Sequence, residues 1–117
     1  MSMSKTMDQK RAAHAWEAAV RGQGDDEFRT MVKKLPVLIQ TCGLGQAVAF
    51  LEAKRKAPKL AEALDEWMSQ AIPGGGGKLL NRIVHGDGDF LRRATGESLA
   101  YLFWLGRFAE ANEKNGK

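Results

Sequence analysis

Several features that define large classes of proteins are absent from this sequence. Cys42 is the only cysteine among 117 residues, which excludes an internal disulfide and a zinc site built from several cysteines. No window approaches the roughly 20 apolar residues that a membrane-spanning helix needs. The start of the chain, residues 1–5, has no apolar segment behind its charge, so secretion is not indicated. We therefore expect a cytoplasmic protein that has no contact with a membrane.

Strand patterns are also lacking, because no run of β-branched residues repeats with a period of two. An apolar period of 3.6 residues recurs instead along most of the chain. Apolar residues make up 44% of the sequence and charged residues 27%, which is typical of a globular protein. We predict an all-α fold, a compact bundle of about five to six helices that forms a single domain over residues 1–117.

Helix starts are marked by residues that cap helices well. Thr6 and Gln9 have the spacing of a capping box, Asp25 or Asp26 can cap a second helix, and Pro58 suits the first turn of another. These positions predict where three of the helices begin.

Proline and glycine interrupt the helical pattern at three places. Pro36 lies inside the second predicted helix, where we expect a kink. Gly43 is expected to end that helix, and Gly45 to serve close packing or capping. Residues 73–77, a proline followed by four glycines, predict a flexible linker.

Apolar stripes mark the helix faces that pack. In the first helix one stripe contains Ala12, Ala15, Trp16, Ala19 and Val20, although spacing alone does not assign Trp16, Trp67 or Trp104 to the core or to an interface. In the last helix, from about residue 89 to 112, the apolar arc is wide, which indicates either a central helix or aromatic side chains shown to a partner. The single cysteine follows an apolar run and is expected to be a small buried residue.

The turn at residues 85–89 contains one imidazole and two carboxylates, from His85, Asp87 and Asp89, within five residues. Such a group could indicate a metal-assisted hydrolase. Either aspartate is also a natural cap for the following helix, and we prefer that interpretation. No catalytic group, metal site or cofactor site is predicted, so we do not expect an enzyme.

Positive charge is concentrated between Arg29 and Lys59, where seven basic residues stand against Glu52 alone, within a net charge of +4. Such a field attracts polyanions, but a solvated helix face gives the same count, so charge alone leaves nucleic-acid binding open. Backbone amides at the helix start after Gly43, together with Gln46, could contact a phosphate or a ribose hydroxyl.

Two long motifs resemble one known family. Residues 33–51, KKLPVLIQTCGLGQAVAFL, resemble the central motif of the Cmr small subunit of type III-B CRISPR effector complexes. Residues 100–109, AYLFWLGRFA, resemble that family's last helix, and residues 9–12 also fit. The glycines at 74–77 and Gly106 are less characteristic of the family. These differences bear on the loops and the surface and not on the resemblance itself.

This resemblance implies a small helical subunit without catalytic residues. Several copies would stack into an inner filament beside the backbone that holds the guide RNA, and target RNA would run along the filament. The implied partners are the backbone and large subunits, guide RNA, target RNA and further copies of the chain. The implied RNA-binding residues are Lys33, Lys34, Gln46, Lys54 and Arg55, with Arg92 and Arg93 as a second patch.

The alternative is a helix-turn-helix DNA-binding protein, with its two helices joined at residues 43–45. A recognition helix presents polar side chains from its early turns. Here Gln46 is followed by the apolar run at residues 47–51, so the surface is too apolar for that role.

Overall fold

All regular secondary structure in the part of the chain that the structure describes is helical. The structure is a computed structural model, and it describes residues 4–75 and 77–115. It contains six helices: α1 (Met7–Arg21), α2 (Asp26–Cys42), α3 (Leu44–Lys54), α4 (Pro58–Ala71), α5 (Leu79–His85) and α6 (Gly88–Asn115). The predicted fold class and number of helices are confirmed. None of the described helices has the length and apolar character required to cross a bilayer.

The predicted helix starts are also confirmed. The hydroxyl of Thr6 accepts a hydrogen bond from the backbone N–H of Gln9 at 3.1 Å, and the Gln9 side chain accepts one from the Thr6 N–H at 2.8 Å. Asp25 caps α2 by accepting from the N–H of Phe28 at 3.1 Å, and Pro58 is the first residue of α4. These interactions involve neighbours in sequence, which is why the sequence predicts them.

The junction between α2 and α3 is a single glycine. Helix α2 passes through Pro36 and does not restart there. Gly43 is both the C-cap of α2 and the N-cap of α3, with φ +90° and ψ 160°. Gly45 lies inside α3, where an added Cβ would make an ordinary contact of 3.5 Å with Ile83. Conformation therefore requires glycine at position 43, whereas packing does not require it at position 45.

The predicted linker joins α4 to α5, and its residue Gly76 lies outside the described residues. The end of α4, just before this linker, is tied to α5 by Arg82, whose guanidinium donates hydrogen bonds to the carbonyls of Met68 at 3.2 Å and Ile72 at 2.5 Å. The Met68 carbonyl also accepts the backbone N–H of Ile72 at 3.0 Å, so Arg82 adds a side-chain donor at the C-terminal end of α4.

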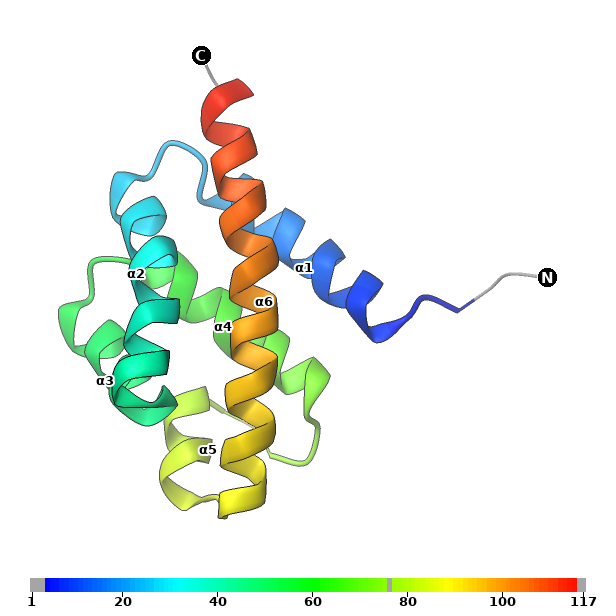
Figure 1. Ribbon diagram of the computed structural model, residues 1–117, viewed down its shortest axis with the longest axis vertical. Coiled ribbons are helices and arrows are strands. Elements are labelled where there is room, and N and C mark those ends of the chain that lie inside the picture. The colour runs from blue at the N-terminus through cyan, green and yellow to red at the C-terminus, as the bar shows by residue number, and fades with distance from the viewer. Residues whose placement is uncertain (1–3, 76, 116–117) are drawn as a thin grey trace.

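Helix α6 runs the length of the molecule and lies between α1 and α2 (Figure 1). Its most extensive contact is with α1, so the first and last helices of the chain are paired. Of the two interpretations of its wide apolar arc, the contacts of α6 with α1, α2, α3 and α4 favour the central helix. One aromatic side chain of this helix still faces outward, because Phe103 is 67% exposed.

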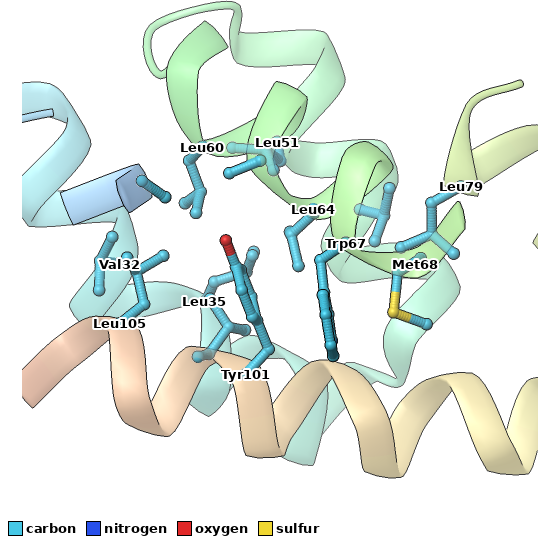
Figure 2. Close-up of a cluster of buried hydrophobic side chains, with 14 of the residues drawn as sticks. Val32, Leu35, Leu51, Leu60, Leu64, Trp67, Met68, Leu79, Tyr101 and Leu105 are labelled. Carbon is cyan, nitrogen blue, oxygen red and sulfur yellow. The ribbon is translucent and has the colours of Figure 1, made fainter. Parts of the chain in front are cut away.

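The core is formed where α2, α3 and α4 meet α6 (Figure 2). The rings of Trp67 and Tyr101 stack with their centroids 5.9 Å apart and their planes 11° apart. Leu35, Leu60 and Leu105 pack in the same core and are completely buried. Burial of these large side chains is the main favourable contribution to folding.

The apolar stripe of α1 is only partly buried. Trp16 and Val20 are 46% and 48% exposed, and the face that contacts α4 and α6 buries only alanines, at positions 15, 18 and 19. Small side chains let α1 approach its neighbours closely, which leaves Trp16 at the rim, edge-on against Phe108 at 5.2 Å. Cys42 is exposed as well, because it is the last residue of α2 and the chain turns away at Gly43.

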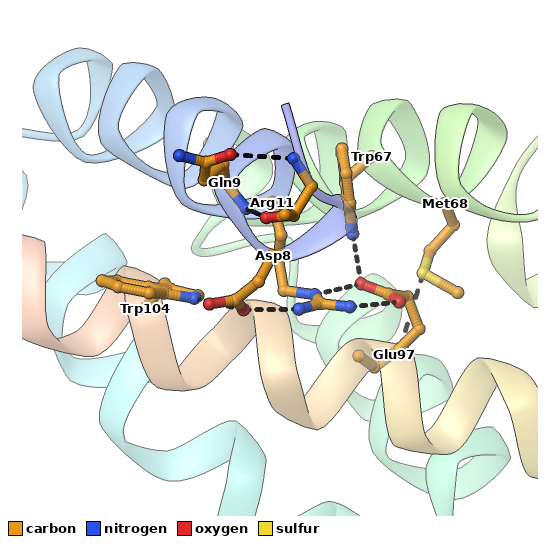
Figure 3. A network of polar contacts seen from close by, with 9 residues as sticks. Asp8, Gln9, Arg11, Trp67, Met68, Glu97 and Trp104 are labelled. Carbon is orange, nitrogen blue, oxygen red and sulfur yellow. Dashed lines mark hydrogen bonds and ion pairs between the residues drawn. The ribbon is translucent and has the colours of Figure 1, made fainter. Parts of the chain in front are cut away.

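A polar network joins α1, α4 and α6 (Figure 3). The Arg11 guanidinium pairs with Glu97 at 2.5 and 2.9 Å, and the indole N–H of Trp67 donates to the same carboxylate at 2.8 Å. Asp8 accepts from Arg11 at 2.6 Å and from the indole N–H of Trp104 at 3.0 Å. Burial acts to raise the pKa of Glu97, but the hydrogen bonds from Arg11 and Trp67 outweigh it and lower that pKa.

His14 forms a second polar contact between the same helices. Its Nδ1 lies 2.8 Å from the Tyr101 hydroxyl, and its Nε2 lies 3.1 Å from a Glu66 oxygen. Because a carboxylate only accepts, Nε2 carries the hydrogen and Nδ1 accepts from Tyr101. Burial lowers the pKa of His14 and raises that of Tyr101. Both groups are therefore held in their neutral forms.

Candidate nucleic-acid interface

All seven residues predicted to contact RNA have exposed side chains. They occupy three regions: Lys33 and Lys34 in the middle of α2, Gln46 and Lys54 at the two ends of α3 with Arg55 following, and Arg92 with Arg93 near the start of α6. The first two regions belong to neighbouring helices, since α2 and α3 pack against each other. We call Lys33, Lys34, Lys54 and Arg55 the α2–α3 cations.

The structure brings Lys34 and Lys54 together at one aromatic ring. The ammonium nitrogen of Lys34 lies 5.3 Å from the centroid of the Phe50 ring, and that of Lys54 lies 5.4 Å from it. Each contact is a cation–π interaction, which contributes about 0.5 to 1 kcal/mol at an exposed site. The nitrogens are at most about 11 Å apart, because their separation cannot exceed the sum of the 5.3 and 5.4 Å distances. That is close to the Debye length of about 10 Å at 0.1 M salt.

None of the α2–α3 cations has an acidic partner within the described part of the chain. Other basic residues nearby are paired: Lys59 lies 3.8 Å from Asp25, and Lys78 lies 3.5 Å from Glu52. The positive charge on this surface is therefore not neutralised from within the described chain and is free to attract an anion.

Arg55 has an unusual backbone conformation. It is the C-cap of α3 and has φ +54°, the only positive φ at a residue other than glycine among those described. A helix often ends with a residue in this left-handed conformation, and that residue is usually glycine because a Cβ is disfavoured there. An arginine at this position costs stability, and its exposed side chain adds to the positive surface.

Gln46 lies in the first turn of α3, eight residues before Lys54. At 1.5 Å per residue the two positions are about 12 Å apart along the helix. No side chain caps the start of α3. The predicted contacts on this helix therefore extend along its length and include unbonded backbone amides at its N-terminus.

Arg92 and Arg93 form a separate patch. Gly106 of α6 lies beside Val32 of α2, since a Cβ added at Gly106 would be 3.9 Å from the Val32 side chain. Arg92 is fourteen residues earlier in the same helix, about 20 Å along its axis. The structure therefore does not bring these arginines together with the α2–α3 cations. Arg92 also pairs with Asp89 at 3.1 Å.

Neither alternative function is favoured by the geometry. Helix α3 buries Leu44, Ala47 and Val48, and Gln46 is the one polar side chain in its first two turns, so it lacks the exposed polar face of a recognition helix. In the turn at residues 85–89, Asp87 caps α6 by accepting from the Phe90 N–H at 2.9 Å. Within residues 4–75 and 77–115, no three His, Cys, Asp or Glu residues are grouped so as to hold a metal ion.

Phe50 was not predicted as part of the site. The sequence contains one signal for its role, because Lys54 follows it by four residues on the same helix and such pairs lie on one face. The second lysine comes from α2, and only the packing of α2 on α3 brings it to the ring.

Comparisons with known proteins agree with one another. Residues 7–112 match the family described as "CRISPR-associated protein (Cas_Cmr5)". The CRISPR system Cmr subunit Cmr5 of Thermus thermophilus is 34% identical over 114 residues, which cover 92% of this chain and 96% of that protein. A crystal structure of a CRISPR-associated Cmr5 family protein from Thermus thermophilus superimposes with a TM-score of 0.75 and 33% identity, over 92% of this chain and 97% of the other.

Proposed function

Because this chain belongs to the Cmr5 family of CRISPR-associated proteins, we propose that it is the non-catalytic small subunit of a type III-B Cmr effector complex. In this role it contacts and stabilises target RNA. Several copies stack into an inner filament beside the backbone subunits that hold the guide RNA. Its partners are those subunits, the large subunit, the guide and target RNAs and further copies of itself. It works in the cytoplasm.

One observation carries the RNA-binding part of this proposal. Lys34 and Lys54, from two helices, converge on Phe50 without an acidic partner among the described residues. Lysine side chains bind phosphate oxygens without distinguishing one base from another. Such a surface suits an RNA strand whose sequence is read by base pairing with a guide.

Several copies of the chain, held together in a filament, can retain RNA through contacts that are individually weak. A single chain offers few phosphate contacts, and each contact releases counterions and weakens as salt rises. When copies are held in a filament, the contacts that follow the first become effectively intramolecular. We therefore expect the isolated chain to bind RNA poorly and the assembled complex to retain it.

The buried and partly buried polar groups support a non-catalytic role. Glu97 is engaged by Arg11 and Trp67, and His14 is held between Tyr101 and Glu66. These groups are committed to contacts between helices. They hold the bundle together.

The test compares two double charge reversals in the reconstituted complex. Lys34→Glu with Lys54→Glu should lower target-RNA retention about tenfold at roughly 0.15 M salt and weaken its salt dependence. Lys5→Glu with Lys10→Glu changes the same number of charges, at exposed positions in and just before α1, and should have little effect. Circular dichroism should show that both variants melt like the parent. Unchanged retention at several salt concentrations would contradict the proposal.

A further inference from the structure

Phe50 has two environments. One side of the residue packs against the hydrophobic core as a partly buried side chain of α3. The ring also has the ammonium groups of Lys34 and Lys54 within 5.3 and 5.4 Å of its centroid. The core thus fixes the position of the ring, and the ring limits where two otherwise flexible lysine side chains reside.

This arrangement places like charges near each other. Both ammonium groups are attracted to the negative face of the aromatic ring, which offsets part of their mutual repulsion. At a separation of no more than about one Debye length the repulsion is not fully screened. An anion bound near both lysines would relieve this repulsion, so the arrangement suits a negatively charged ligand.

We propose that Phe50 is a positioning residue for RNA, which holds Lys34 and Lys54 as a clamp for a phosphodiester group of the RNA backbone. The inference deepens the proposed function and rests on it. In this proposal the ring acts through the two ammonium groups, whose nitrogens lie 5.3 and 5.4 Å from its centroid, and not by stacking on a base. Recognition by this clamp is independent of base identity.

The experiment uses the assembled complex and measures retention of a single-stranded target RNA over a series of salt concentrations. Phe50→Leu keeps an apolar side chain in the core but removes the ring, and Phe50→Tyr keeps the ring. We expect Phe50→Leu to lower retention roughly fivefold, because two cation–π interactions are removed. It should also flatten the salt dependence, by up to about 0.7 in slope for each phosphate that is no longer neutralised. Phe50→Tyr should behave like the parent.

A combined variant separates positioning from stacking. In a Lys34→Gln, Lys54→Gln background, adding Phe50→Leu should cause no further decrease in retention, because there are no ammonium groups left to position. A further decrease in that background, with an unchanged salt slope, would mean that the ring contacts bases and would overturn the inference.

Two other outcomes separate a failure of the Phe50 clamp from a failure of the proposed RNA-binding function. If Phe50→Leu retains RNA like the parent while the double lysine variant does not, the clamp is wrong and the proposed function stands. If the double lysine variant also retains RNA like the parent, the proposed RNA contact itself fails. Thermal melting of each variant shows whether it folds. If Phe50→Leu is less stable than the parent, Phe50→Tyr supplies a second comparison.

Discussion

The guanidinium of Arg11 and the carboxylate of Glu97 form two hydrogen bonds, at 2.5 and 2.9 Å, across 86 residues of sequence. Both side chains are largely withdrawn from water, with 14% and 13% of their surface exposed. The indole N–H of Trp67 donates to the same carboxylate, so α1, α4 and α6 are joined at one point. Removal of the carboxylate would leave the Trp67 indole N–H and two nitrogens of the Arg11 guanidinium unpaired, with Asp8 as the remaining partner of Arg11.

We therefore expect Glu97→Ala to lower the free energy of unfolding by about 3 kcal/mol, as measured by urea denaturation. The control is Asp89→Ala, which removes the partner of Arg92 from an exposed pair and should cost less than about 1 kcal/mol. Equal losses of stability in the two variants would contradict the structural role given to Glu97.

Stability should depend on pH through His14. Burial holds the pKa of His14 below its ordinary value of 6.5, so between these two values the unfolded chain binds a proton that the folded chain does not. The contribution of this group to stability is fully present above pH 6.5 and is lost as the pH falls toward the lower folded pKa.

Urea denaturation at about pH 7.5 and about pH 5.5, on either side of the ordinary histidine pKa, measures this effect. We expect His14→Gln to lose less stability between the two pH values than the parent does. The same loss of stability between the two pH values in His14→Gln and in the parent would refute the assignment.

The two glycines of the α2–α3 junction should respond in opposite ways to alanine. Gly43→Ala should cost about 1 to 3 kcal/mol, because φ +90° with ψ 160° is a conformation that only glycine adopts readily. Gly45→Ala should be neutral or stabilise by up to about 1 kcal/mol, because it replaces glycine inside a helix and the new Cβ has room. Chemical denaturation of both variants tests the pair, and a reversed order would contradict the structure.

Arg55 should show a conflict between stability and binding. Arg55→Gly is expected to raise the free energy of unfolding by about 0.5 to 1 kcal/mol by relieving the left-handed backbone. The same substitution should lower RNA retention by the assembled complex, because it removes one of the α2–α3 cations. Lys56→Gly removes an equal charge without relieving such strain and should not be stabilising. Stabilisation without weaker retention would leave Arg55 with no role in RNA binding.

The parts of the fold that the sequence predicts are those determined by near neighbours. The caps at Thr6 and Asp25 and the break at Gly43 each depend on residues within one helical turn. The predicted number of helices follows from those starts and stops. Burial is predicted less well, because an apolar stripe does not indicate which of its side chains an adjacent helix will cover. Trp16 belongs to the stripe of α1 by spacing, but the alanines form the actual contact.

The candidate site divides in the same way. The exposure of the residues predicted to contact RNA could be predicted from their helical positions. All seven, which are six basic residues and Gln46, have exposed side chains. How these residues group on the surface could not be predicted, because it depends on how the helices pack. Lys34 and Lys54 meet at Phe50, whereas Arg92 and Arg93 lie apart near the start of α6. The pair of Arg11 and Glu97 has no signal in a single sequence.

The pairing of α1 with α6 has a consequence for the order of events during synthesis. Among the described helices the ribosome makes α1 first, but α6, with which α1 has its most extensive contact, is made last. Contacts between distant parts of a chain close slowly, since they require a long loop to be ordered. Helices α2, α3 and α4 can associate as they emerge, whereas α1 stays incompletely covered until α6 has left the ribosome. Completion of the bundle is therefore a late step, reached only when nearly the whole chain has been translated.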